Sequence, residues 1–342
     1  MKKILSTILI LTMLLSASMM LTAFPGFAAE EAAPASTEAT AVELPNYDET
    51  WTAINSINDL AGIESNKKYY LNTDLTITDS WTPLARNSFT LDGRDPSGKV
   101  HKIIFGSENK SVTTSKTLFA STTSATIQNL ELVGKIAIST NLDKRYSPLG
   151  NNSFVNPVIK NVNSSVDMTY TGPDATANGQ EPFAGIICWV ADGGSTLIEN
   201  CVYSGTIRYE SYVKGVSGIV AIWSTTTNTG GTGTIRNCIN KGTFSFGSGF
   251  LDNTAGFSGG GIIGNMWSDY TSMSDCLIEG CVNEGKNEFD NVVPAFSGNT
   301  YRAGIVGRIN TRSGNITIKD CVNKENVNTP YGSNWAGVVG RI

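Results

Sequence analysis

The chain has 342 residues, a formal net charge of −5, 35 glycines and only 16% charged residues. Its acidic and evenly spread charge argues against nucleic acid or an anionic membrane surface as a partner. The many glycines and few charges suit a fold of many short strands and tight turns.

The first residues have the pattern of a secretory signal peptide. Lys2 and Lys3 precede an apolar run over residues 4–21, and the small residues Gly26 and Ala28 offer a cleavage site. We assign residues 1–28 to a signal peptide and expect a secreted protein, extracellular or at the cell surface. Its removal leaves a net charge of −7. No later stretch is apolar enough to span a bilayer, so we expect no membrane insertion after cleavage.

Residues 29–48 are rich in Ala, Glu, Thr and Pro, and this composition predicts a disordered linker. Beyond the linker, residues 51–62 carry apolar side chains at helical spacing, which predicts a short helix that caps the first coil. The first strands are expected in four segments: 69–78, 81–84, 89–93 and 103–106.

A repeat of about forty residues is the strongest signal in the sequence. Four segments align without gaps on cysteines that are spaced by 37, 43 and 40 residues: 198–205, 235–242, 278–285 and 318–325. Two weaker copies, 127–130 and 159–162, have an aliphatic residue in place of the cysteine. A second block, of the type Ala-Gly-Ile-Val-Gly, recurs at 184–188, 217–221, 260–264, 303–307 and 336–340.

Each repeat is expected to supply about three short strands. Such units cannot bury an apolar face alone, but they can when they stack. We therefore predict an all-β fold, a right-handed parallel β-helix over residues 49–342. A β-sandwich and a β-propeller are the alternatives. A propeller blade needs about four antiparallel strands, and the strand count and ladder-like repeats favour the β-helix.

The core motif, Ile-x-Asn-Cys, places Ile and Cys three residues apart, so both point inward only if the chain bends between them. Asn, Gly and Asp tolerate the left-handed backbone region, so the residue before the cysteine is the expected bend. The inward isoleucines should form a core column: Ile127, Ile159, Ile198, Ile235, Ile278 and Ile318.

The order of the segments carries a resemblance to a known family. Tyr69-Tyr-Leu, Trp81-Thr-Pro-Leu, Phe89-Thr-Leu-Asp-Gly and Ile127-Gln-Asn-Leu, followed by the two repeat blocks, resemble bacterial surface proteins with GLUG-type repeats, of pectin-lyase-like β-helix architecture. The likeness covers nearly all of residues 51–342. Members are secreted or wall-attached, and the motif also occurs in large IgA-cleaving metalloproteases, outside their catalytic part. The resemblance implies a scaffold and carries over no catalytic residue.

The last segment, 335–342, matches 302–309 closely and shows no polar capping element or sorting motif after it. We expect the repeat domain to be truncated at its C-terminus, as a fragment of a longer protein. The alternative is an end-to-end contact of the uncapped coil with another molecule.

Six cysteines in a secreted protein raise the question of disulfides. Four of them occupy one repeat position where earlier copies have Leu or Val, which favours a column of stacked buried thiols: Cys201, Cys238, Cys281 and Cys321. Any disulfide is expected to involve Cys188 or Cys276. With one histidine and no Cys-x-x-Cys, we predict no metal site.

The acidic residues are scattered, and the paired carboxylates of polysaccharide-cleaving enzymes are not recognisable. Asp92 and Asp95 come nearest to a cluster, but Asp-Gly favours a plain β-turn. His101 is expected at the surface. We predict no catalytic residue and no cofactor.

Three tryptophans follow the second block in successive repeats: Trp189, Trp223 and Trp267. A row of aromatic faces along one edge would suit sugar rings, and the alternative is that they cover apolar surface at the corners. The segments that vary most between repeats are further candidates, because recognition usually lies in loops on a rigid scaffold: residues 141–156, 171–181, 224–232, 247–255 and 286–299.

Three functions are compatible with this pattern. The first is a non-enzymatic extracellular scaffold or adhesin-type module that contacts glycans or cell-surface proteins. The second is a polysaccharide-active lyase or hydrolase. The third is the stalk of a larger secreted enzyme, such as an IgA-type metalloprotease. We favour the first.

Overall fold

The computed structural model describes the following residues of the unit Glu43–Ile342: 44–107, 110–113, 116–139, 145–173, 182–192, 194–211, 213–225, 231–247, 257–267, 273–289, 300–311, 314–325 and 335–342. The predicted signal peptide and most of the predicted linker lie outside the described residues. The described chain is nearly all β-structure, with a single helix, α1 (Ile57–Ala61).

The strands of the described residues form three sheets. The large sheet contains β1 (Trp51–Ile54), β2 (Lys68–Leu71), β3 (Leu75–Ile77), β5 (Thr90–Asp92), β6 (Lys102–Phe105), β7 (Val112–Thr113), β9 (Thr126–Ile138), β11 (Val158–Ser164), β12 (Asp167–Tyr170), β15 (Thr196–Glu199), β16 (Val202–Tyr203), β17 (Thr206–Tyr209), β20 (Gly231–Arg236), β21 (Ile239–Asn240), β22 (Thr243–Phe246), β25 (Met273–Glu279), β26 (Val282–Asn283), β27 (Lys286–Phe289), β30 (Ile316–Lys319) and β31 (Val322–Asn323).

The second sheet, here the seven-stranded sheet, contains β4 (Leu84–Asn87), β8 (Phe119–Thr123), β10 (Ser153–Val155), β14 (Ile187–Asp192), β19 (Val220–Thr225), β24 (Ile263–Trp267) and β29 (Val306–Asn310). The five-stranded sheet contains β13 (Pro182–Ala184), β18 (Gly215–Ser217), β23 (Phe257–Gly260), β28 (Thr300–Ala303) and β32 (Trp335–Ala336).

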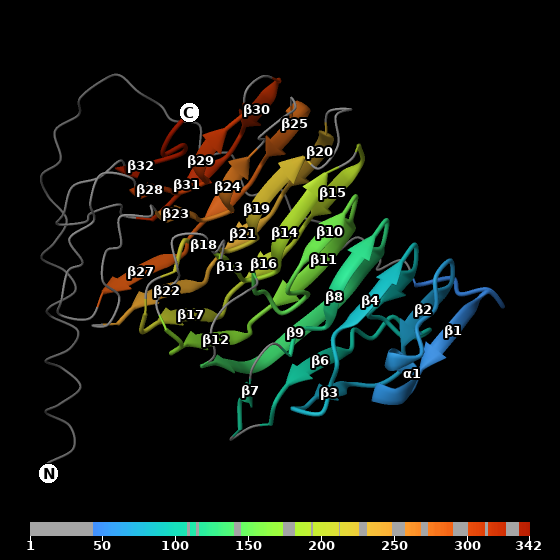
Figure 1. The fold of residues 1–342 in the computed structure, drawn as a ribbon. Coiled ribbons are helices and arrows are strands. Elements are labelled where there is room, and N and C mark those ends of the chain that lie inside the picture. The colour runs from blue at the N-terminus through green and yellow to red at the C-terminus, as the bar shows by residue number, and fades with distance from the viewer. Residues whose placement is uncertain are drawn as a thin grey trace, which may run out of the picture. The chain divides into compact units, whose positions relative to one another are not determined.

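Strands of successive repeats pair in parallel in all three sheets, for example β15 with β20, β14 with β19 and β18 with β23. In Figure 1 these neighbours lie side by side and their colour changes step by step along each sheet. Sandwiches and propellers are built from antiparallel strands, so the parallel pairing excludes both alternatives. The arrangement is consistent with a β-solenoid.

One repeat supplies five strands rather than the three that the sequence predicts. In the repeat from β15 to β19, the first three strands belong to the large sheet, β18 to the five-stranded sheet and β19 to the seven-stranded sheet. The chain then returns to β20, which pairs with β15. The sequence undercounts because bends at Asn200 and at Gly218 divide segments that read as continuous strands.

The first coil differs from the prediction in one respect. The helix predicted over 51–62 is wrong in its first half, because residues 51–54 form β1 and pair in parallel with β2. Helix α1 begins after Ser56, whose hydroxyl accepts a hydrogen bond from the Asp59 N–H at 3.2 Å. Leu60 of the helix is fully buried. The four residues of β1 thus extend the sheet, and α1 packs against β1 and β3.

Three of the four predicted early strand segments contain strands, namely β2 with β3, β5 and β6. The segment 81–84 does not, except for Leu84, where β4 begins. The Trp81 N–H donates to the Thr78 carbonyl at 3.0 Å, so the chain turns where the sequence reads as extended.

The predicted bend before the cysteine is confirmed. The residue at this position has a positive φ of 53° to 54° at Asn129, Asn161, Asn200 and Asn237, 61° at Gly280 and 54° at Asp320. Because of the bend, the isoleucine two residues before it and the residue directly after it both point inward. Five isoleucines of the expected column are fully buried and the sixth, Ile318, is partly buried, and the strand register places all six in line: Ile127, Ile159, Ile198, Ile235, Ile278 and Ile318.

Aromatic rings form a second column inside the described coils, with neighbouring centroids 5.3 to 6.1 Å apart: Tyr146, Phe183, Tyr209, Phe246 and Phe257. The buried guanidinium of Arg302 lies at the end of this column, 4.3 Å from the centroid of the Phe246 ring and 4.6 Å from that of Phe257. Arg302 occupies the position held by Gly259 one coil earlier, so the missing side chain of Gly259 leaves room for it.

The glycine of the second block is required by close approach of the next coil. A Cβ on Gly218 would lie 2.5 Å from the Gly261 carbonyl oxygen, and one on Gly261 would lie 2.2 Å from the Gly304 carbonyl oxygen. Real Cβ atoms do not approach backbone oxygens this closely. The glycine of each block before the last therefore sets the spacing between coils at this corner.

We predict that Gly218→Ala lowers stability by about 1–3 kcal/mol, the usual cost of overpacking. Gly337→Ala is the matched control, because it stands at the same position of the last block and a Cβ there meets nothing within 4 Å. The thermal unfolding midpoint of the two variants measures the difference. Equal midpoints for Gly218→Ala and Gly337→Ala would contradict the prediction, because they would show that the added Cβ at residue 218 costs no stability.

Candidate functional site

The three predicted tryptophans do not form a row. In the seven-stranded sheet, Trp189 pairs with Ile222, Trp223 with Met266, and Ser224 with Trp267, so the three occupy three different positions across the strands. Trp223 lies in a column of fully buried residues with Val190 and Met266. The prediction of a row of tryptophans is therefore wrong, because a shift of one residue along a strand moves a side chain to the opposite face.

Trp189 and Trp267 flank this buried position and lie on the outer face of the seven-stranded sheet, where both are half-buried. The Trp189 indole Nε1 donates to the Ser224 hydroxyl at 2.6 Å. The guanidinium carbon of Arg145 lies 3.8 Å from the centroid of the Trp189 ring, a cation–π contact. Burial lowers the pKa of Arg145.

The same face carries a second guanidinium, that of Arg308, three coils further along the column of Trp189. Asn265 pairs with Arg308, and the Arg308 guanidinium lies 5.3 Å from the centroid of the Tyr301 ring. Burial lowers the pKa of Arg308. We take this outer face as the candidate site, since indole and guanidinium groups can stack on and hydrogen-bond to polar ligands. The binding role of Trp189 and Trp267 stays a prediction.

The sequence does not reveal the arginines of this face. Arg145 comes before β10, outside either repeat block, and meets Trp189 of the following coil only because the coils stack. Of the predicted variable segments, large parts lie outside the described residues: 141–144, 174–181, 226–230, 248–255 and 290–299.

The four cysteines of the repeat lie in one column, each with its Sγ directed at a carbonyl oxygen of the coil before: Cys201, Cys238, Cys281 and Cys321. The distance from the Cys238 Sγ to the Ile198 oxygen is 3.8 Å. All six cysteines are free thiols, and five of them are buried. Burial raises the pKa of Cys188 to about 12 and that of Cys238 well above its ordinary value. Buried thiols of this kind are unreactive.

We predict that the folded protein exposes at most one thiol to a thiol-specific reagent. Cys321 is only partly buried and should react first, while the other five stay protected until the protein unfolds. Titration with Ellman's reagent, before and after denaturation without reductant, counts the thiols. A total below six after denaturation would reveal a disulfide and contradict the thiol column.

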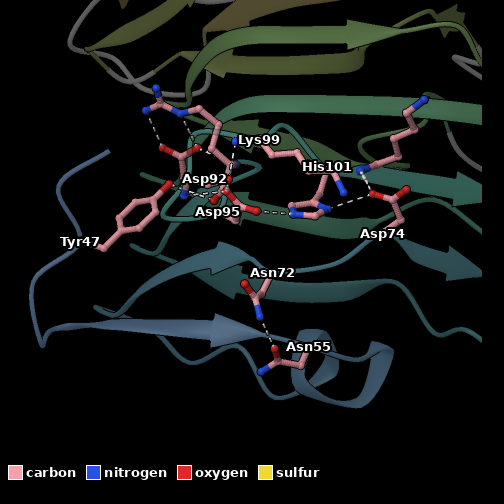
Figure 2. Close-up of polar contacts among 11 residues, drawn as sticks. Tyr47, Asn55, Asn72, Asp74, Asp92, Asp95, Lys99 and His101 are labelled. Atoms are coloured by element: carbon pink, nitrogen blue, oxygen red, sulfur yellow. Dashed lines mark hydrogen bonds and ion pairs between the residues drawn. The ribbon is translucent and has the colours of Figure 1, made fainter. Parts of the chain in front are cut away.

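Asp92 and its neighbours form the densest polar cluster of the first coils, shown in Figure 2. The Asp92 carboxylate is 1% exposed and accepts hydrogen bonds from Arg94, Gln128 and Asn129 at 2.8 to 3.3 Å. The Tyr47 hydroxyl donates to the Arg94 carbonyl at 3.0 Å, and burial raises the pKa of Tyr47. These bonds fasten the segment around Tyr47 to the coil that follows β5.

His101 is 3% exposed, so the prediction that it lies at the surface is wrong. Its Nδ1 lies 3.0 Å from the Asp74 carboxylate and its Nε2 lies 3.2 Å from the Asp95 carboxylate, as Figure 2 shows. The chain from 93 to 101 folds back on itself, since the His101 N–H donates to the Gly93 carbonyl at 2.7 Å. The Asp74 and Asp95 carboxylates therefore hold His101, and with it the start of β6, in place; we call this arrangement of Asp74, Asp95 and His101 the clamp.

Both clamping carboxylates are stabilised in their charged form. A hydrogen bond from Ser97, with further bonds from His101 and backbone N–H groups, lowers the pKa of Asp95 to about 2. For Asp74, burial acts in the opposite direction, but the Lys102 N–H and His101 lower its pKa. Ser97 donates to Asp95 at 2.5 Å rather than to the imidazole, so the geometry is that of a clamp and not of an activated serine.

We predict that the clamp weakens in acid. A carboxylate with a lowered pKa stabilises the fold above its unfolded pKa, near 4, and this contribution is lost as the pH falls toward 2. Asp95→Asn should therefore flatten the fall in thermal midpoint between pH 5 and about pH 2. Asp320→Asn, which makes the same charge change at an exposed bend, is the control. Equal slopes for Asp95→Asn and the wild type would contradict the role of Asp95.

The described residues contain no group of three or more His, Cys, Asp or Glu side chains placed to hold a metal ion. Within the same residues, no helix has the length and apolar character needed to cross a membrane.

The fold is that of a repeat protein built from long parallel sheets, and the candidate site lies on the outer face of its seven-stranded sheet. No family model matches the chain, and no curated protein matches it. A solved structure to which the chain is similar is described as a "putative immunoglobulin A1 protease" from Bacteroides ovatus. It is 17% identical, with a TM-score of 0.44, and the match covers 84% of this chain and 83% of that chain.

Proposed function

We propose that the chain is a non-enzymatic extracellular scaffold of the adhesin type, secreted or held at a bacterial cell surface. In this proposal its GLUG-type repeats close into a right-handed parallel β-helix. The scaffold contacts glycans or cell-surface proteins through its outer face and its inter-strand segments.

One observation carries the proposal. The segment that joins the large sheet to the five-stranded sheet differs in length between successive repeats, spanning residues 171–181, 210–214, 247–256 and 290–299. The strands on either side nevertheless keep their register, since β18, β23 and β28 pair residue for residue. A frame that accepts insertions at one place without a change in its own pairing suits the display of variable binding segments.

The polar side chains of the described coils support the same function. His101 is engaged with Asp74 and Asp95, and Asp92 accepts hydrogen bonds from Arg94, Gln128 and Asn129, so these groups hold the chain in place. A rigid frame of this kind presents a ligand with fixed outer side chains, which lowers the entropic cost of binding.

The test is binding by the secreted chain, immobilised and exposed to a glycan array and to extracted cell-surface proteins. In the main variant, residues 247–256 are replaced by the sequence of residues 210–214. Trp267→Ala is the second variant and is chosen over Trp223→Ala, because Trp223 is fully buried and its loss would leave a cavity. We expect one or both variants to lose binding by tenfold or more with an unchanged circular dichroism spectrum.

Absence of binding to every glycan and surface protein would overturn the adhesin function. Release of reducing sugars or of unsaturated products from acidic polysaccharides would overturn the non-enzymatic assignment.

A further inference from the structure

A cleft lies between helix α1 and the segment that leads from β3 into β4. Figure 1 shows these elements near the blue, N-terminal end of the described chain. The cleft has a volume of about 510 Å³. This size falls within the range of about 300–1,000 Å³ that is usual for small-molecule sites. The cleft is far along the chain from the outer face that carries Trp189 and Trp267.

One wall of the cleft is a series of hydroxyl groups. Thr76, Thr78 and Ser80 alternate along the chain and are all exposed, and Thr82 continues the series. The Thr78 and Ser80 hydroxyl oxygens lie 2.8 Å apart. A hydroxyl group both donates and accepts, so this wall can bind the hydroxyl groups of a ligand in either sense.

Apolar groups lie among the hydroxyls. Ile57, Trp81, Pro83 and Leu84 line the same cleft. Trp81 is held in place, because its indole Nε1 donates to the Thr117 carbonyl at 3.0 Å. Trp81 and Leu84 are buried, so the apolar surface open to a ligand comes mainly from the half-buried Ile57 and Pro83. A lining that mixes apolar and hydroxyl groups matches the C–H and hydroxyl groups of a sugar ring.

The charge of the cleft points to a neutral ligand. Its lining residues include no carboxylate, and Arg86 is their only cation. The Arg86 guanidinium donates to the carbonyl oxygens of Ile63, Ala85 and Ala61 at 2.6, 2.9 and 3.2 Å. These bonds tie the end of α1 to β4 and fix the two walls, and they engage the cation that an acidic sugar would need.

We propose that this cleft is a binding site for a neutral oligosaccharide. The inference rests on the proposed function in one respect, since it names the glycan class that the scaffold would contact, and it adds a site that is separate from the outer face.

Isothermal titration of the secreted chain with neutral oligosaccharides tests the proposal. The probes are cello-, xylo-, manno- and malto-oligosaccharides, with oligogalacturonate as the acidic comparison. We expect one neutral series to bind and oligogalacturonate to bind at least tenfold more weakly. The double variant Thr78→Val/Ser80→Ala should weaken binding about tenfold, because two hydrogen-bonding groups of the wall are lost.

Two further variants keep the test decisive. Ala61→Trp places a bulky side chain on an exposed position of the lining and should abolish binding without touching the core. Ser204→Ala/Thr317→Val removes two exposed hydroxyls elsewhere and should leave the affinity unchanged. Thermal midpoints equal to that of the wild type confirm that each variant folds.

The site is overturned if no neutral oligosaccharide binds, if the acidic one binds best, or if the cleft variants bind as the wild type does. Cell-surface or glycan-array binding that survives the cleft variants would leave the proposed function intact while this site fails. Neutral oligosaccharide binding in the cleft without any surface binding would support the site while the adhesin function fails.

Discussion

The fold depends on one backbone constraint, that every coil turns at the same residue. The left-handed position at Asn161, Asn200 and Asn237 lets both the isoleucine two residues before it and the residue directly after it point inward. It also keeps the backbone in register with the next coil, since the Asn200 N–H donates to the Arg236 carbonyl and the Asn237 N–H to that of Glu279. Without this common bend the isoleucine and cysteine columns would not form, and the strands would lose their parallel partners.

Because the common bend keeps the coils in register, equivalent residues stack in the interior even where they are polar. Tyr203 is replaced in the next coils by Asn240, Asn283 and Asn323, and the amide of each asparagine donates to the following one at 2.8 Å. Because equivalent residues stack directly, one buried amide satisfies the next. The same stacking places Glu325, where earlier repeats have Gly, beside this ladder at 3.1 Å from the Asn283 amide, and burial raises its pKa. A polar residue is therefore accepted inside a coil when the adjacent coil supplies its partner.

The sequence predicts those features that recur at a fixed position and fails on those that depend on contact between coils. The isoleucine column and the bend at Asn237 could be read directly, because identical residues must stack in a parallel repeat. The row of tryptophans could not, since Trp223 is one residue out of line with Trp189 and a single residue reverses the face. His101 was misplaced for a similar reason, because its two carboxylate partners are 27 and 6 residues away in sequence. No sequence motif marks the cleft beside α1, because its two walls come together only when the first coils stack.

A repeated core raises a problem of its own, because any coil could stack on any other with isoleucine against isoleucine. The outer face of the large sheet offers a physical answer. Lys160, Glu199, Arg236, Glu279 and Lys319 occupy one column in successive coils and alternate in charge. Three ion pairs join neighbours in this column: Lys160 with Glu199 at 3.9 Å, Arg236 with Glu199 at 2.7 Å, and Lys319 with Glu279 at 2.6 Å.

Each such surface pair contributes only about 0.2–1 kcal/mol to stability. If a coil instead met its second neighbour, Lys160 would face Arg236 and Glu199 would face Glu279, and like charges directly opposite each other are destabilising. The alternation thus distinguishes the correct neighbour from the next one at a position where the core cannot, which makes it a device for specificity more than for stability.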